Sequence, residues 1–173
     1  MNLREDINYS IWCDFIEREF LENEFQTIID DGIIHGATSN PAIFQQSIST
    51  STAYTQQINM LQANDVKKIY EELAITDIKR AAEILKPLYE KNANDGFISL
   101  EVDPTLCDDM MGTIEEGARL HSIIASDNIM IKIPATEAGY GAMEHLTSMG
   151  INVNATLIFS PDQAIKSTNA LNN

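Results

Sequence analysis

The stretch Ile129–Pro134, which reads IMIKIP, decides how this chain of 173 residues is interpreted. Successive side chains of a strand point to opposite faces, so the three isoleucines share one face while Met130 and Lys132 share the other. The segment therefore predicts a strand with one apolar face and one face that carries a cation. A lysine in such a strand is unusual enough to direct attention to the rest of the sheet.

Apolar runs of the same kind occur on both sides of this stretch, and helical patterns separate them. We predict strands at Ile11–Phe15, Ile33–Thr38, Phe97–Val102, Ile129–Ile133 and Ile151–Phe159. Helices are predicted over 20–29, two or three times within 42–94, over 108–125, from Thr136 to Gly150, and from the capping box Ser160-Pro161-Asp162-Gln163. Strands that alternate with helices indicate a parallel sheet covered by helices.

Polar residues share one face of each predicted strand, and in the first three strands they lie toward the C-terminal end. They are Asp14, Thr38, Ser99, Glu101, Asp103, Lys132, Asn152, Asn154, Thr156 and Ser160. A parallel α/β barrel gathers its functional residues at the C-terminal ends of the strands and covers the apolar face with helices. The pattern therefore favours a barrel over an open sheet, with Trp12 and Met130 filling its interior.

The charge balance of the sequence indicates which classes of molecule the protein binds. Eleven Lys and Arg against 26 Asp and Glu give a net charge of -15, which repels phosphate backbones and anionic lipids. We expect a small-molecule partner, no nucleic acid and no membrane. The polar, acidic start and the absence of a long apolar stretch predict a cytoplasmic protein.

Neither cysteines nor histidines follow a metal-binding spacing. Cys13 and Cys107 are too few and too far apart for a disulfide framework or a Cys-x-x-Cys site, and we expect structural thiols. His35, His121 and His145 show no ligand motif. We predict no metal and no cofactor.

Lys132 is the strongest candidate for chemistry. Its apolar neighbours remove hydration, which disfavours the charged form, and a neutral amine is a nucleophile. Such a lysine commonly forms a Schiff base with a carbonyl substrate, and Asp14 and Glu101 could move the protons that this requires. The alternative is a structural ion pair between Lys132 and Glu101 or Asp103.

Five segments resemble transaldolase in order and spacing. They are Trp12-Cys13-Asp14, ATSNPAIF at 37–44, SLEVDP at 99–104, IKIPAT at 131–136 and INVNATLIFS at 151–160. Transaldolases are similar in fold to the class I aldolases, which are (β/α)8 TIM barrels without a metal. The resemblance implies a transferase that moves a dihydroxyacetone unit between sugar phosphates in the pentose phosphate pathway.

The resemblance also implies roles for particular residues. Lys132 is expected to form the Schiff base, and Asp14 to exchange the proton of the hydroxyl at the bond that breaks. Glu101, with Thr156 and a water, is expected to shuttle protons during imine formation. The expected substrate-binding residues are Asn40, Asn154, Thr38 and Ser160. Alternatively, Asn40 is only a helix cap, and Asn154 and Thr156 are only hydrogen-bond partners in the barrel interior.

The chain is short for this fold, since a (β/α)8 barrel takes about 250 residues. We expect residues 1–173 to form a single domain, the N-terminal part of a transaldolase barrel with about five βα units and a helical insertion at about 42–94. The arginine and serine that the family contributes from later strands are absent. Exposed sheet edges then favour association of two copies as a homodimer.

Three functions remain open at this point. The first is transaldolase, which converts sedoheptulose 7-phosphate and glyceraldehyde 3-phosphate to erythrose 4-phosphate and fructose 6-phosphate. The second is a lyase similar to fructose-6-phosphate aldolase, because the same lysine and carboxylates serve both reactions. The third is a truncated, non-catalytic fragment.

Overall fold

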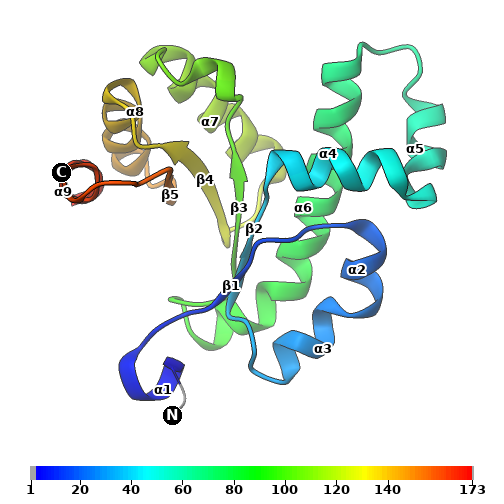
Figure 1. Ribbon diagram of the computed structural model, residues 1–173, viewed down its shortest axis with the longest axis horizontal. Helices are drawn as coiled ribbons and strands as arrows, with labels where there is room; N and C mark the ends of the chain where they lie inside the picture. Colours follow the sequence, from blue (N-terminus) through cyan, green and yellow to red (C-terminus); the bar gives the residue numbers. More distant parts are fainter. Residues whose placement is uncertain (1–2, 173) are drawn as a thin grey trace. The chain divides into compact units, whose positions relative to one another are not determined.

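The computed structural model describes residues 3–172. Five strands form one parallel sheet in chain order, as the alternating pattern predicts (Figure 1). They are β1 (Trp12–Cys13), β2 (Gly36–Thr38), β3 (Phe97–Glu101), β4 (Ile129–Pro134) and β5 (Val153–Thr156). Helices follow each strand, which confirms an α/β fold with five βα units.

The helices lie close to their predicted positions. The first is α1 (Leu3–Ile7), which the apolar pattern does not predict. The others are α2 (Arg18–Asn23), α3 (Phe25–Asp30), α4 (Pro41–Thr50), α5 (Thr55–Met60), α6 (Val66–Lys91), α7 (Met110–Ile124), α8 (Glu137–Ser148) and α9 (Pro161–Asn172). Short 3-10 turns, η1 (Thr52–Tyr54) and η2 (Pro104–Leu106), precede α5 and follow β3.

The chain divides within β3 into two compact units, residues 1–98 and 99–173. In the first unit β1 pairs with β2, with Trp12 opposite Gly36. A side chain at Gly36 would come within 2.7 Å of the Trp12 ring and 2.9 Å of the Phe97 carbonyl oxygen, so only glycine fits beneath the indole. The long helix α6 passes beside α5 and α2 and buries an apolar stripe (Figure 1).

In the second unit β4 pairs with β5, and α7, α8 and α9 contact one another in succession. Ile129, Ile131 and Ile133 are fully buried, whereas Met130 and Lys132 are partly exposed. This alternation confirms the prediction of one apolar and one polar face for β4. The apolar face packs against α7 and α8, where Gly117 lies close to Ile131.

The predicted helix over 20–29 is instead two helices that meet at Glu24. The side chain of Asn23 donates a hydrogen bond of 2.6 Å to the Glu19 carbonyl oxygen. That oxygen is the acceptor that the backbone N–H of residue 23 uses in a regular helix, so the side chain competes with the ladder. Apolar spacing does not reveal this interruption.

The fifth strand is shorter than predicted, because it ends at Thr156 instead of Phe159. Leu157 has a φ of 59°, in the left-handed region that a strand cannot continue through. Phe159 is consequently 83% exposed, although its place in the alternation predicts a buried side chain. Likewise β1 extends only over Trp12–Cys13 of the predicted Ile11–Phe15.

Candidate active site

Lys132 and Glu101 form an ion pair in the second unit. The Lys132 Nζ lies 3.5 Å from a Glu101 carboxylate oxygen, and the two side chains are 12% and 14% exposed. Glu101 ends β3, and the backbone N–H of the next residue, Val102, donates to the Lys132 carbonyl oxygen at 3.2 Å. The pairing of these strand ends thus holds an amine beside a carboxylate, where most of both side chains is shielded from water.

Asn154 lies beside Lys132 on β5. The parallel register aligns Lys132 with Asn154, so both side chains belong to the same face of the sheet. The Asn154 Nδ2 donates a hydrogen bond of 3.0 Å to the Ser99 Oγ. Ser99 is fully buried. The Ser99 hydroxyl therefore fixes the orientation of the Asn154 amide. The sequence pattern predicts that Ser99 lies on the polar face, but it does not predict this role.

Thr156 and Ser160 lie further toward the C-terminal end of β5. Thr156 is aligned with Pro134, and its carbonyl oxygen accepts from the Ala135 N–H at 2.8 Å. Ser160 precedes α9, where its Oγ accepts from the Gln163 N–H at 3.2 Å and Gln163 in turn accepts from the Phe159 N–H at 2.9 Å. The predicted capping box is confirmed in this form, and the Ser160 hydroxyl is engaged in it.

The remaining predicted residues belong to the first unit. Asp14 is exposed and follows β1 directly, while Thr38 is the last residue of β2. Because Cys13 is aligned with Ala37 in the parallel pair, Asp14 and Thr38 follow at neighbouring positions of adjacent strands. The Thr38 Oγ1 donates to the Ser39 carbonyl oxygen at 3.4 Å.

Asn40 caps helix α4. Its Oδ1 accepts hydrogen bonds from the Ala42 and Ile43 N–H groups at 3.1 and 3.4 Å, and Pro41 occupies the first helical position. The capping role predicted for Asn40 is therefore confirmed. The cap uses only the amide oxygen, so the two N–H donors of the amide are the part that could bind a substrate hydroxyl.

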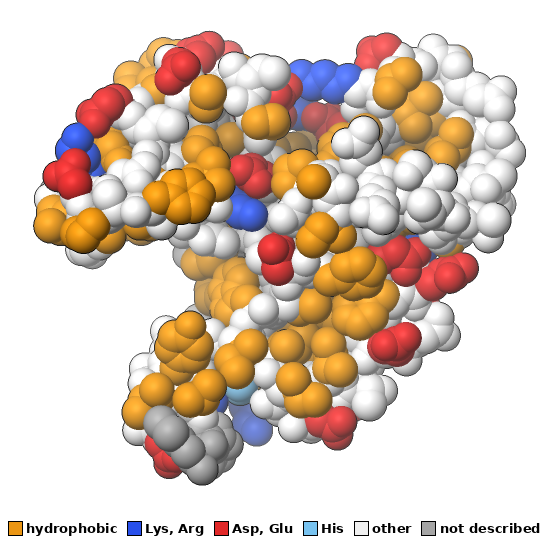
Figure 2. All heavy atoms as spheres, in the orientation of Figure 1, with side chains coloured by type: hydrophobic (Ala, Val, Ile, Leu, Met, Phe, Trp, Pro, Cys, Tyr) orange, Lys and Arg blue, Asp and Glu red, His pale blue; other side chains and the backbone are white. Residues whose placement is uncertain are grey.

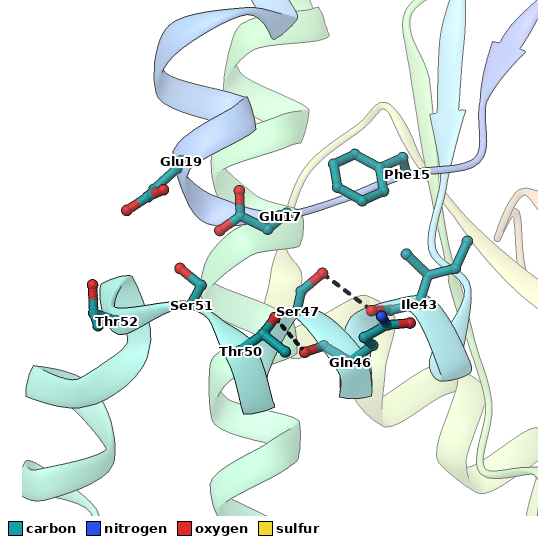
Figure 3. A pocket seen from close by; sticks show the side chains of 9 residues that line it. All are labelled: Phe15, Glu17, Glu19, Ile43, Gln46, Ser47, Thr50, Ser51 and Thr52. Atoms are coloured by element: carbon teal, nitrogen blue, oxygen red, sulfur yellow. Dashed lines mark hydrogen bonds between the residues drawn. The ribbon is translucent and has the colours of Figure 1, made fainter.

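An open pocket of about 670 Å³ lies in the first unit beside the connection that carries Asp14. Figure 3 shows Phe15, Glu17 and Glu19 on one side and residues of α4 and its C-terminal end on the other. Glu17 caps α2 through Oε2, whereas its buried Oε1 has no hydrogen-bond partner among the described residues. This carboxylate oxygen is shielded from water, so the Glu17 side chain contributes to the wall of the pocket mainly through its contact with α2.

Cys13 is adjacent to Asp14 but is poorly suited to act as a nucleophile. Burial raises the pKa of the Cys13 thiol, and Asp14 raises it further. The thiol donates weakly to the Phe15 carbonyl oxygen at 3.5 Å. Cys13 therefore remains a protonated thiol that helps to shape the connection after β1.

The described residues contain neither a grouping of metal ligands nor a membrane-spanning helix. Between residues 3 and 172, no three His, Cys, Asp or Glu side chains are grouped so that they could hold a metal ion. None of the helices in this range combines the length and apolarity needed to cross a membrane.

The fold and the lysine site together define a class: an α/β protein whose parallel strands carry an amine, a carboxylate and an amide on one polar face. The sequence matches the family described as Transaldolase/Fructose-6-phosphate aldolase over residues 11–173. A transaldolase of Campylobacter jejuni (strain 81-176) is 53% identical over 165 residues, which cover 95% of this chain and 50% of that protein. A transaldolase of Helicobacter pylori (strain Shi470) is 49% identical over 163 residues, or 94% of this chain and 52% of that protein.

The chain belongs to the transaldolase/fructose-6-phosphate aldolase family. The resemblance to transaldolase is thereby confirmed, and the five-stranded parallel sheet that alternates with helices is consistent with a partial fold of the (β/α)8 barrel type. The chain spans about half the length of the curated relatives it matches.

Proposed function

We propose that the protein is a transaldolase, which transfers a dihydroxyacetone unit from a ketose phosphate to an aldose phosphate. One observation carries this proposal: the Lys132 Nζ of β4 lies 3.5 Å from the carboxylate of Glu101, which ends the adjacent strand β3, in a chain of this family. The family includes both transferases and aldolases that use a carbonyl substrate. The proposed reaction uses only protein groups.

In the first step, the Lys132 amine attacks the C2 carbonyl of the ketose, and loss of water from the carbinolamine gives an iminium ion. Lys132 must give up a proton before it attacks, and the carbinolamine hydroxyl must gain one before it leaves. Glu101 is close enough to accept the first proton and return it to the hydroxyl, directly or through a water held with Thr156. Its ion pair with Lys132 is thus the resting state of the proton shuttle.

In the second step, Asp14 removes the proton of the C4 hydroxyl and the C3–C4 bond breaks. The electron pair of that bond moves into the iminium ion, which becomes an enamine, and the aldose phosphate leaves. The acceptor aldose then adds by the reverse sequence, and hydrolysis of the imine frees Lys132. We assign Asn154 and Asn40 to the hydroxyls of the bound unit, Thr38 to support of Asp14, and Ser160 to substrate binding.

We further propose that residues 1–173 form the N-terminal part of the barrel as a single domain, with residues 42–94 as a helical insertion. We also propose that the protein acts on sugar phosphates and lies in the cytoplasm. The net charge of -15 supports a phosphate site that is built locally, from helix N-termini or an individual arginine, instead of a broad cationic surface.

The experiment that tests this function separates transfer from simple cleavage. The protein expressed from its complete gene is incubated with fructose 6-phosphate, with and without erythrose 4-phosphate, and the products are separated. A transaldolase forms sedoheptulose 7-phosphate only when the acceptor is present, and little free dihydroxyacetone without it. Rapid release of dihydroxyacetone without acceptor would instead identify an aldolase, and no turnover in either case would leave a non-catalytic protein.

A further inference from the structure

The connection between β1 and α2 ends on a polar cluster that is largely buried. Residues 14–17 join Cys13, the last residue of β1, to Arg18, the first residue of α2. A connection this short has little freedom once both ends are fixed, because each residue spans at most about 3.6 Å. The pairing of β1 with β2 fixes one end. The contacts of Arg18 fix the other.

Arg18 binds residues of η1, α5 and α6, which are distant in the sequence. Its Nε donates to Asp77 at 2.9 Å, its Nη2 lies 2.8 Å from the same carboxylate oxygen, and Nη2 also donates to the Gln57 Oε1 at 2.7 Å. Its Nη1 donates to the Ala53 carbonyl oxygen at 3.3 Å. The guanidinium carbon also lies 4.6 Å from the centre of the Tyr54 ring. Every part of the guanidinium is thus held.

Tyr54 connects this side chain to the backbone of the connection. The Tyr54 hydroxyl accepts from the backbone N–H of Arg18 at 3.1 Å and donates to the second oxygen of Asp77 at 2.8 Å. Tyr54 is fully buried and Asp77 is 1% exposed. We call Arg18, Tyr54 and Asp77 the Arg18 cluster. It closes a ring of hydrogen bonds that defines both the position and the direction of the chain at residue 18.

The Arg18 cluster contributes more to the orientation of the chain than to the stability of the fold. The buried Asp77 carboxylate and the partly buried Arg18 guanidinium, which is 22% exposed, lose hydration, so such a pair adds less stability than its contacts suggest. What the planar guanidinium adds is orientation, because its donors are fixed relative to one another, whereas a lysine ammonium is a single rotatable point charge. The Arg18 cluster thus fixes the direction in which residues 14–17 reach the start of α2.

We propose that Arg18 is a positioning residue for Asp14. The Arg18 cluster holds the start of α2, and with it residues 14–17, where Asp14 can exchange a proton with the substrate hydroxyl. Arg18 itself is committed to protein groups and acts only through the backbone. This inference rests on the proposed function, since it assigns to Asp14 the proton transfer that accompanies carbon–carbon bond cleavage.

The test measures Schiff-base formation and bond cleavage separately. Protein from the complete gene is mixed with fructose 6-phosphate and reduced with borohydride, and mass spectrometry gives the ratio of the uncleaved hexose phosphate adduct to the cleaved three-carbon adduct. The variants are Arg18→Lys, which keeps the charge but loses the fork, and Tyr54→Phe, which keeps the ring but loses the hydroxyl. Steady-state kinetics and melting temperatures are recorded for each.

Arg80→Lys is the matched control. Arg80 of α6 also binds a carboxylate of α2 through two nitrogens, to Glu22 at 2.7 and 3.0 Å, but this pair is 44% and 50% exposed and lies away from the connection. It therefore reports the effect of weakening an arginine link between α2 and α6 without disturbing the Arg18 cluster.

The expected result is that Arg18→Lys and Tyr54→Phe lower kcat by about 10- to 100-fold, as misplacement of a reacting group does. KM should remain within about twofold, and the trapped material should shift toward the uncleaved adduct. Arg80→Lys should match the wild type in each respect. If both cluster variants lose adduct and turnover only in proportion to their folded fraction, or match Arg80→Lys, the inference is overturned. If the wild type forms no adduct, the proposed function itself fails.

Discussion

At Lys132, the distance to Glu101 says what kind of interaction the resting site contains. A separation of 3.5 Å is an ion pair but is longer than a strong charge-assisted hydrogen bond. The structural ion pair that the sequence leaves open as an alternative is therefore present, and it is compatible with chemistry. Only reactivity distinguishes a purely structural pair from a proton shuttle, because both have the same geometry before substrate binds.

Substitutions of Asn40 can separate its role as a helix cap from its proposed role in substrate binding. Asn40→Asp keeps an oxygen that caps α4, and Asp caps helices about as well as Asn, so we expect the free energy of unfolding to stay within about 0.5 kcal/mol. The substitution removes the amide donors, so kcat/KM should fall at least about tenfold, as for the loss of one hydrogen bond.

Urea unfolding and steady-state kinetics of Asn40→Asp and Asn40→Ala check this expectation. Asn40→Ala should lose about 1 kcal/mol of stability in addition to the activity. Unchanged kinetics in Asn40→Asp would limit Asn40 to the role of a helix cap.

Asp77 predicts a pH dependence of stability. Burial raises the pKa of its carboxyl above the ordinary 3.8, an effect that Arg18 and Tyr54 only partly offset. Above 3.8 the native state then binds more protons than the unfolded chain, so this group's contribution to the free energy of unfolding falls as the pH rises through the raised pKa.

The difference in unfolding free energy between the wild type and Asp77→Asn isolates this contribution, because the other carboxyl groups are common to both. We expect the free energy of unfolding of the wild type to rise relative to that of Asp77→Asn as the pH is lowered from about 7 to about 4. A difference that is constant or shrinks over this range would contradict the raised pKa. The Asp77 carboxyl shift, followed by NMR, gives the same answer if the variant does not fold.

At the scale of the element, the start of α8 fixes the end of β4, which carries Lys132. A Cβ at Gly139 would overlap the Pro134 carbonyl oxygen, and backbone cannot move aside. A Cβ at Gly141, on the same helix, would meet only the flexible end of the Met110 side chain. The two glycines therefore lie in the same helix but have different surroundings.

We expect Gly139→Ala to lower the free energy of unfolding by about 2 kcal/mol, because overpacking against backbone forces the helix away from the strand. Gly141→Ala should be neutral or stabilise by up to about 1 kcal/mol, since alanine favours the helix. Chemical denaturation of both variants tests this pair. Equal effects would mean that the Pro134 contact does not constrain α8.

The elements also show what a sequence can and cannot reveal. The alternation of Ile129, Ile131 and Ile133 with Met130 and Lys132 predicts β4 and its faces, because strand periodicity is local. The end of β5 comes with the left-handed backbone of Leu157, and the break at Glu24 lies beside the side-chain hydrogen bond of Asn23; apolar spacing records neither feature.

The candidate site divides in the same way. The resemblance to transaldolase predicts Lys132, Glu101 and Asn154, and the structure aligns them on one face of the second unit. The resemblance does not predict the Arg18 cluster, because Arg18 and Asp77 are 59 residues apart and each has an ordinary place in a helix. Pairings of this kind follow from tertiary structure and not from pattern.

At the scale of the whole molecule, the exposed apolar residues bear on association. β1 and β5 are the outermost strands of the sheet, and Phe159, Ile165, Leu157 and Ile158 are 83%, 61%, 52% and 40% exposed. Apolar side chains are visible on the surface around β5 and α9, at the left of Figure 2. Unpaired strand edges beside apolar surface favour self-association.

Residues 1–173 expressed alone should therefore form dimers or larger species. Added salt should strengthen the association, because it screens the net charge of -15. Size-exclusion chromatography with light scattering at low and moderate salt measures this. A monomer that melts cooperatively at both salt concentrations would contradict the expectation.

The central claim is that Lys132 forms a Schiff base with a ketose phosphate, and borohydride trapping tests it most directly. Protein from the complete gene is reduced in the presence of fructose 6-phosphate, and digestion locates the adduct. Lys132→Gln is compared with Lys166→Gln, since Lys166 is paired with Glu137 but 42% exposed on α9. The account predicts an adduct on Lys132 that only Lys132→Gln abolishes. No adduct, or one that persists in Lys132→Gln, would contradict it.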